Sequence, residues 1–273
     1  MTTDNNDERG ARSGDRRGIQ SIEVGGALLQ ALATHVGPMM LKDLARAAGM
    51  PPAKAHPYLV SFGKLGLIEQ DAVTGRYGLG AFALQMGLSA LQGLNPIRAA
   101  TPAVATLSDE IQQNVAIAVW GNQGPTIVSI EECSRPVHVN MRPGTVMSLL
   151  NSATGRVYAA FLPERMTAPL IQEELARIGG DAENGLRLSR KHVDSDLADV
   201  RARKLARAVG HPIPGINAFC APVFDHNGHL ALAITAMGPS GSFPPDWDGP
   251  VACKVRACAE AITARLGRPP QAG

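Results

Sequence analysis

The sequence predicts an α+β protein with an N-terminal winged helix-turn-helix, a linker helix and a C-terminal domain built on an antiparallel sheet. Apolar residues between positions 41 and 65 recur every three or four residues, the period of a helix, and two short strand-like segments follow. Beyond position 114, strand-like segments come in pairs, with helical segments between and after them. With 273 residues and 45% hydrophobic content, the chain is long enough for two hydrophobic cores.

The helix-turn-helix is predicted within residues 41–66. Leu41, Leu44 and Ala48 fall on one face of a helix that Gly49 ends. Two prolines at 51 and 52 open the next helix, because proline in the first turn loses no intrahelical hydrogen bond. Residues 67–70 and 76–79 are predicted strands around a turn at 71–75, where Gly75 supplies a positive φ.

In a winged helix-turn-helix the second helix lies in the major groove, with its early outward residues near base edges and phosphates. A basic side chain on the hairpin can contact the backbone of the duplex. The alternative is a small helical domain whose hairpin binds another protein. The residues predicted to contact double-stranded DNA are Lys42, Ala53, Lys54, His56, Tyr58 and Arg76.

Several separated segments resemble the IclR family of transcriptional regulators. In the first domain these are GIQSIEV at 18–24, LLQAL at 28–32, LARAAGMP at 44–51 and TGRYGLG at 74–80. In the second they are LLNSATGR at 149–156, PGIN at 214–217 and APVFD at 221–225. The resemblance implies a dimer or dimer of dimers, a GAF-like effector domain and a small-molecule site in that domain.

Two residues depart from the family pattern. Pro57 stands where the family usually carries a basic residue, and a proline inside a helix costs about 3 kcal/mol, so it should bend or shorten the reading helix. Met40 precedes the first helix where a Ser or Thr cap is common, and a missing cap costs about 1 kcal/mol. Both departures predict weaker operator binding than is usual in the family.

The charge of the first domain gives little extra attraction for DNA. Five cations stand against four carboxylates between positions 21 and 80. A dimer doubles the phosphate contacts and spaces two reading helices about one turn of DNA apart. The cations are Lys42, Arg46, Lys54, Lys64 and Arg76, and the carboxylates are Glu23, Asp43, Glu69 and Asp71.

The predicted domain limits are a disordered tail at 1–18, the DNA-binding domain at 19–80, a linker helix at 81–95, the effector domain at 96–267 and a tail at 268–273. Leu84, Leu88 and Leu91 follow the helical period in the linker, and Asn95 and Pro96 begin the next helix. In the family this linker is partly the dimer seam. The first tail mixes both charges without an apolar segment, so it is not a signal peptide.

A cytoplasmic protein without membrane contact is expected. No apolar stretch reaches membrane-spanning length, and the cysteines form no CxxC pair, which favours reduced thiols. These are Cys133, Cys220, Cys253 and Cys258.

The second domain is predicted to hold strands at 115–120, 126–130, 137–141, 219–224 and 229–237. An Asn-Gly pair within the turn at 225–228 favours a hairpin between the last two. Helices are predicted at 154–162, 165–177, 194–208 and 251–266. Paired strands with helices outside them indicate an antiparallel sheet.

A candidate effector site begins where a strand predicted to end at Leu150 passes into a helix. There the amides of Ala153 and Thr154 would be donors at the positive end of a helix dipole, which suits a carboxylate. The alternative is that Asn151 or Ser152 caps the helix and the amides face water. The resemblance favours the site, and the weakly charged walls suggest an aromatic or short-chain organic acid. The predicted lining is Met141, Leu150, Asn151, Ser152, Ala153, Thr154, Ile216, Asn217, Cys220 and Thr235.

Catalytic and metal motifs are not found in the sequence, so no cofactor, metal ligand or catalytic residue is assigned. His226 and His229 flank a turn without further ligands at a suitable spacing. The resulting hypothesis is a homo-oligomeric DNA-binding regulator that responds to a small carboxylate. Two alternatives are a ligand-sensing relative that has lost DNA binding and, more distantly, an enzyme using the C-terminal cavity.

Overall fold

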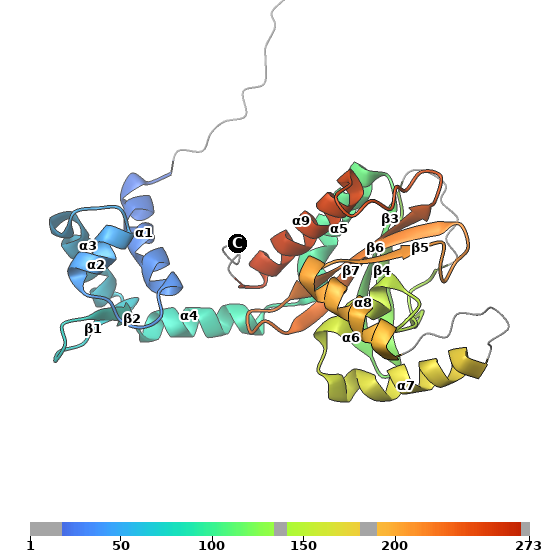
Figure 1. Ribbon diagram of the computed structural model, residues 1–273. Helices are drawn as coiled ribbons and strands as arrows, with labels where there is room; N and C mark the ends of the chain where they lie inside the picture. Colours follow the sequence, from blue (N-terminus) through green and yellow to red (C-terminus); the bar gives the residue numbers. More distant parts are fainter. Residues whose placement is uncertain (1–17, 134–140, 181–189, 269–273) are drawn as a thin grey trace, which may run out of the picture. The chain divides into compact units, whose positions relative to one another are not determined.

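The computed structural model describes residues 18–133, 141–180 and 190–268 of the 273-residue chain. The chain forms two compact units, residues 1–93 and 94–273, whose elements are labelled in Figure 1. The predicted terminal tails lie outside the described residues, except for Gly18 and Arg268. The predicted α+β class, with an N-terminal helix-turn-helix and a C-terminal antiparallel sheet, is confirmed.

The N-terminal unit packs three helices and a short hairpin around one core. Leu28 of α1, Leu44 of α2 and Leu59 of α3 are almost fully buried in it. Gly25 lets α1 approach α3, because a Cβ at this position would come within 2.9 Å of the Tyr58 and Phe62 rings. The elements are α1 (Gln20–Thr34), α2 (Leu41–Ala47), α3 (Pro52–Lys64), β1 (Ile68–Gln70), β2 (Tyr77–Leu79) and α4 (Ala81–Gln92).

The ends of α2 follow the sequence prediction. Gly49, beyond its C-terminus, has a φ of +67°. Met40 is the N-cap residue, and its side chain makes no capping hydrogen bond. The antiparallel β1–β2 hairpin also forms as expected, and Gly75 in its turn has a φ of +67°.

Pro57 is predicted from the sequence to bend or shorten the reading helix, and it does not shorten it. Helix α3 runs without interruption from Pro52 to Lys64, with Pro57 as its sixth residue. A proline at this position removes a single backbone hydrogen bond, the one to the carbonyl of Ala53. The other bonds of the helix and the burial of Ala55 and Leu59 hold its second half in place.

Helix α4 carries large apolar side chains that the unit itself does not cover. Leu84 is 64% exposed and Leu88 is 52% exposed. Phe82 and Met86 are also exposed, and the helix contains no charged residue. A helix that is apolar on several faces is normally buried, so the exposure of these side chains is unusual.

The C-terminal unit is a five-stranded antiparallel sheet in the order β4-β3-β7-β6-β5. Helices α5 and α9 cover one face, and α6, α7 and α8 lie on the other (Figure 1). The helices are α5 (Pro96–Ile111), α6 (Ala153–Phe161), α7 (Glu164–Gly180), α8 (Arg190–Arg203) and α9 (Pro250–Arg265), and the strands are β3 (Asn114–Gly121), β4 (Gly124–Glu131), β5 (Ala206–Val209), β6 (Ile216–Phe224) and β7 (Leu230–Pro239).

The two faces of the sheet are packed differently because side chains alternate along each strand. In β6, Phe219 and Val223 belong to the core under α5 and α9, whereas Cys220 belongs to the core under α6. The face toward α6 is rich in small residues. Those in its core or packed against it include Ala116, Ala118, Ala206, Ala208, Ala218 and Ala233.

Two secondary-structure predictions in this unit are wrong. The helix expected at 194–208 ends at Arg203, and Lys204 with a φ of +48° leads into strand β5. The strand expected to end at Leu150 is a turn, since the only pairing just before it is an isolated bridge between Thr126 and Val146. The strand expected at 137–141 lies outside the described residues, apart from Met141, which is not in a strand.

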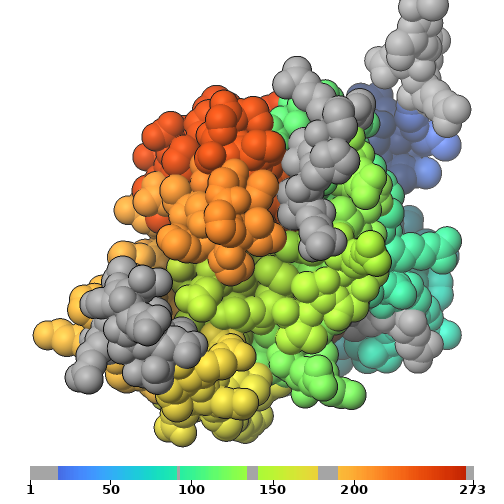
Figure 2. Space-filling view, turned by 90° about the vertical axis from the view of Figure 1, so that its right-hand side faces the viewer, coloured from blue at the N-terminus to red at the C-terminus, as the bar shows by residue number. Residues whose placement is uncertain are grey.

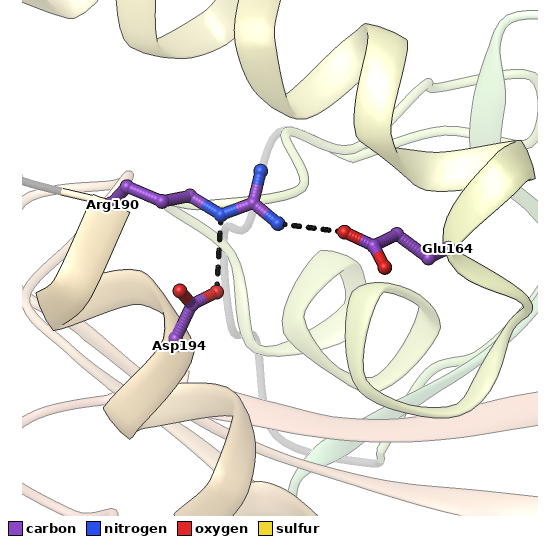
Figure 3. A network of polar contacts seen from close by, with 3 residues as sticks. All are labelled: Glu164, Arg190 and Asp194. Carbon is purple, nitrogen blue, oxygen red and sulfur yellow. Dashed lines mark hydrogen bonds and ion pairs between the residues drawn. The ribbon is translucent and has the colours of Figure 1, made fainter.

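An exposed ion-pair network joins the starts of α7 and α8 (Figure 3). Arg190 lies 3.1 Å from Asp194 and 3.0 Å from Glu164. The hydrogen bond and the charge of Asp194, followed by those of Glu164, raise the pKa of Arg190. Because these groups are exposed, the network contributes little to stability and mainly sets the position of one helix end against the other.

Candidate functional site

The N-terminus of α6 is the centre of the predicted effector site. Ser152 is its N-cap, with Oγ accepting a hydrogen bond of 2.8 Å from the amide of Gly155. The amides of Ala153 and Thr154 lie in the first turn and have no hydrogen-bond acceptor among the described residues. The capping interpretation is therefore correct for Ser152, and two amides still remain as donors at the positive end of the helix.

Gly155 allows the segment before α6 to lie directly on the helix. A Cβ at this position would overlap the carbonyl oxygen of Ser148 and come within 2.5 Å of the Leu149 Cα. Both neighbours are backbone atoms, which cannot move aside as a flexible side chain could. The close approach fixes the turn at 148–152 against the first turn of α6.

Glu174 of α7 holds the same turn from the other side. Its Oε1 accepts a hydrogen bond of 2.8 Å from the Leu149 amide. Its Oε2 accepts one of 2.8 Å from the Ser148 hydroxyl and one of 3.0 Å from the Leu150 amide. Figure 2 shows the lime-coloured surface of this part of the chain beside yellow α7. Three hydrogen bonds to one carboxylate connect α7 to the wall of the candidate site.

The polar side chains of the site come from α6 and the sheet. The Thr154 and Thr235 hydroxyls are 2.8 Å apart, and Cys220 stands directly opposite Thr235 in the register of β6 and β7. Burial is the main cause that raises the pKa of the Cys220 thiol to about 12, against the lowering effect of hydrogen bonds with both threonines. The thiol is neutral at pH 7, which makes it a poor nucleophile.

A small pocket lies between the first turn of α6 and the alanine-rich face of the sheet. Its cavity volume is about 30 Å³, room for about one water molecule. Within the part of the chain that the structure describes, no acidic or permanently charged side chain lines it. The lining residues are Met141, Met147, Ser152, Ala153, Thr154, Ala208, His211, Pro212, Ile213, Ile216, Ala218, Thr235 and Met237.

Six predicted effector residues meet in this pocket. They come from three parts of the chain that are far apart in sequence, and most of the further lining residues are apolar. Sequence reasoning missed Met237 and Ala218, although both share a strand and a facing direction with a predicted residue. The six are Met141, Ser152, Ala153, Thr154, Ile216 and Thr235.

The other four predicted residues do not line the pocket. Leu150 is buried in the core under α6, and Cys220 lies fully buried behind the two threonines. The Asn151 amide donates to the Ser148 hydroxyl. Asn217 is on the opposite side of β6, where its side chain accepts from the Gly210 amide and donates to the Phe243 carbonyl.

A half-buried arginine of α6 has a structural role. Arg156 of α6 donates to the carbonyl of Arg207 in β5, which ties the helix to the edge of the sheet. Desolvation by burial is the main cause that lowers its pKa. Tyr158, two residues further on, donates to the Ala118 carbonyl at 2.7 Å, and burial raises its pKa.

The predicted DNA-contacting residues lie in the other unit. Ala53, Lys54 and His56 are exposed in the first half of α3, and Lys42 is exposed on α2. Tyr58 is half-buried, with its ring against Gly25 of α1, so it does not share the exposed face of α3.

The hairpin is fixed by side chains in its turn. Asp71 accepts hydrogen bonds from the amides of Val73 and Thr74 and from the Thr74 hydroxyl. The bonds from Thr74, followed by the one from Val73, lower the pKa of Asp71. Arg76 is exposed, and its guanidinium lies 3.4 Å from the carbonyl of Pro38, so the hairpin presents one held cation.

Neither a membrane helix nor a metal site is found within the described ranges. No helix there is long and apolar enough to cross a membrane. No group of three His, Cys, Asp or Glu residues in those ranges could hold a metal ion.

Comparison with known proteins relates both units to one family. The sequence model of the IclR helix-turn-helix domain matches residues 21–72, and the model described as bacterial transcriptional regulator IclR C-terminal matches residues 88–264. The Escherichia coli K12 transcriptional repressor IclR is 26% identical over 252 residues, which cover 91% of this chain and 90% of that protein. A glycerol operon regulatory protein of Streptomyces griseus is 29% identical over 260 residues, which cover 92% of this chain and 98% of that protein.

Solved structures agree with this relationship. The crystal structure of Pseudomonas aeruginosa HmgR has a TM-score of 0.83 and 39% sequence identity, and the match covers 92% of this chain and 99% of that one. The structure of the Agobacterium tumefaciens repressor BlcR has a TM-score of 0.73 at 17% identity, which supports the fold alone.

Proposed function

Because the chain belongs to the IclR family of bacterial transcriptional regulators, we propose that a small organic acid bound beneath α6 controls how tightly a homo-oligomer of the chain holds its DNA operator. The observation that carries this proposal is the pair of amides, Ala153 and Thr154, at the mouth of a pocket with an apolar lining. A helix N-terminus with open amides favours a carboxylate, and apolar walls favour the body of an organic molecule.

The lining indicates which acid fits. The two amides and one of the Thr154 and Thr235 hydroxyls, which are hydrogen-bonded to each other, can donate to one carboxylate, while Met141, Met147 and Met237 supply adaptable apolar surface. No lysine or arginine among the described residues lines the pocket to attract a second negative charge. We therefore favour a monocarboxylate with an aromatic or short aliphatic body over a dicarboxylate or a sugar acid.

A ligand of this size must enlarge the pocket, since about 30 Å³ holds little more than one water molecule. Met141, Met147, Ser152 in the turn at 148–152, and the segment at 211–213 are the non-helical, non-strand parts of the wall, so they are the parts that can move. Movement of the turn would be passed to α7 through Glu174. A ligand that binds one position of this turn more tightly than the other would shift the regulator from one state to the other.

The first test is whether the purified chain protects a site in the DNA upstream of its own gene. We expect a DNase footprint of two half-sites at low salt, with protection changed by an aromatic acid such as benzoate. Complete lack of protection at low salt would contradict operator binding. Protection that no organic acid alters would instead contradict control by the pocket.

Removing the Thr154 hydroxyl should weaken ligand binding without disturbing the fold. We expect Thr154→Val to lower the affinity for the acid about tenfold, because the carboxylate loses a donor. At a ligand concentration of about 100 times the wild-type Kd, stabilisation should fall from about 2.7 to about 1.4 kcal/mol. Thermal unfolding with and without ligand measures this, and Thr106→Val at an exposed position of α5 is the matched control.

The exposed apolar side chains of α4 are proposed to pack against a second copy of the chain. We expect Leu84→Glu with Leu88→Glu to shift the protein toward monomer, because burying two carboxylates in an apolar interface is strongly unfavourable. Light scattering coupled to size exclusion measures the mass. Val36→Glu, at a side chain 97% exposed outside any helix, should leave the mass unchanged.

One observation favours the alternative of a ligand sensor with weakened DNA binding. Pro57 is exposed on α3 beside Lys54, and the unit holds five cations against four carboxylates within residues 18–93. The same footprint distinguishes this alternative, because a sensor of that kind would bind the acid and protect no site.

A further inference from the structure

A second cavity in the C-terminal unit is much larger than the pocket under α6. Its volume is about 370 Å³, within the range of about 300–1,000 Å³ that is typical of small-molecule sites. It lies where α6 ends, where β6 ends and along the last turns of α9, and it shares no lining residue with the first pocket. Its lining is Phe161, Lys204, Pro222, Phe224, Gly228, Arg256, Ala259, Glu260, Thr263 and Arg268.

The cavity exists because β5 is shorter than β6. Strand β5 pairs with residues 217–220 of β6, so the end of β6 has no neighbouring strand on this side. Pro222 has no amide hydrogen, and the Phe224 amide already donates to the Thr263 hydroxyl at 3.1 Å. The open edge therefore offers few donors to an added strand, which argues against an extended peptide as the occupant.

The floor of the cavity is apolar and partly aromatic. Phe161 of α6 and Phe224 of β6 meet edge to face, with ring centroids 5.2 Å apart and an angle of 76°. Pro222 and buried Ala259 complete this surface. Ring pairs of this geometry readily accept a further flat ring beside them.

The rim of the cavity carries an excess of positive charge. Among the described residues, Lys204, Arg256 and Arg268 line it together with a single carboxylate, Glu260. A concave site that is lined by more cations than carboxylates attracts anions.

Both guanidinium groups are held in place. Arg256 donates to the Trp247 carbonyl at 3.0 Å, and its pair with Asp248 is long, at 3.6 Å, to a carboxylate that is 92% exposed. Arg268 lies over the Phe224 ring, 4.9 Å from its centroid, and packs against Gly228. Positioned cations lose less conformational entropy on binding an anion than free ones do.

From this combination we infer that the cavity at the free end of β6 is a second ligand site, and that it takes a small anion carrying an aromatic ring. The ring lies on Phe161 and Phe224, and the negative group lies between Arg256 and Arg268. Glu260 sits on the same rim and opposes the anion. The site needs neither DNA binding nor the pocket under α6.

The probe is para-fluorobenzoate, titrated into the full chain and followed by fluorine NMR. We expect Arg268→Gln to weaken its binding about fivefold and Glu260→Gln to tighten it about twofold, because one removes an attraction and the other a repulsion. Arg265→Gln removes a cation from the same helix end outside the cavity and should have no effect. Thr154→Val, in the other pocket, should also leave this binding unchanged.

Several results would overturn the inference. One is no binding of the probe to the wild-type chain at millimolar concentration. Another is binding that Thr154→Val weakens and Arg268→Gln leaves unchanged, because the probe would then occupy only the pocket under α6. A third is that neutral para-fluorobenzamide binds as tightly as para-fluorobenzoate. A fourth is that the Arg268 and Glu260 variants bind the probe as tightly as the wild-type chain. Either result would show that the charges of this cavity do not select the ligand.

Discussion

Gly155→Ala is expected to destabilise the C-terminal unit by about 3 kcal/mol, although it adds only one methyl group. The methyl would overlap the Ser148 carbonyl and lie 2.5 Å from the Leu149 Cα, so the backbone of the turn must move. That movement would also disturb the Ser152 cap and the three hydrogen bonds to Glu174. An overpacked core site typically costs 1–3 kcal/mol and a lost cap about 1 kcal/mol.

Tryptophan fluorescence can measure this effect without interference from the DNA-binding unit. The chain has two tryptophans, Trp120 and Trp247, and both lie in the C-terminal unit. At roughly 2–4 °C per kcal/mol for a unit of this size, we expect the Tm to fall by roughly 6–12 °C.

Gly241→Ala is the matched control for this change. A Cβ at Gly241 meets no atom within 4 Å, and its φ is not in the left-handed region, so its Tm should stay near the wild-type value. A Gly155 variant as stable as this control would contradict the close approach of the turn to α6.

The outline of the fold was predictable because local patterns determined it. The three- and four-residue spacing of Leu41, Leu44 and Ala48 gives the first helix of the helix-turn-helix. The Asn-Gly pair at 227–228 sits in the turn joining β6 and β7. In each case the signal lies within one element or one turn, where neighbouring residues alone decide the conformation.

The candidate site was harder to predict because it depends on facing directions and distant contacts. Ile216 and Asn217 were both assigned to the pocket, yet adjacent residues of a strand point to opposite faces, and Asn217 holds Gly210 and Phe243 instead. Glu174 binds a turn 24 to 26 residues away, and no spacing rule connects the two.

The fate of Pro57 illustrates the same limit in the DNA-binding unit. An intrinsic cost of about 3 kcal/mol predicted a shortened helix. The structure keeps the helix because Ala55 and Leu59 are buried against α1 and α2 and stabilise both its halves. Tertiary packing overrides a local preference here, as it commonly does.

Replacing Pro57 with arginine is expected to strengthen operator binding and to steepen its dependence on salt. Pro57 is exposed on α3, in line with Ala53 and Ser61, so an arginine there would extend toward the phosphates. It also restores the backbone donor that proline lacks. Each added phosphate contact changes the slope of log K against log salt by about −0.9, so a dimer with one in each subunit should change it by about −1.8.

Removing a cation from α3 at Lys54 should have the opposite effect on operator binding and its salt dependence. We expect Lys54→Ala to weaken operator binding and to make the salt slope shallower by up to about 1.8 in a dimer, because Lys54 is an exposed cation in the first turn of α3. Lys191→Ala removes the same charge from an exposed position on α8 of the other unit and should leave the slope unchanged. Fluorescence anisotropy on the footprinted operator at several salt concentrations measures the slope for the wild-type chain and for the Pro57, Lys54 and Lys191 variants. If Lys54 and Lys191 variants gave the same slope, α3 would not be the element that lies against the phosphates.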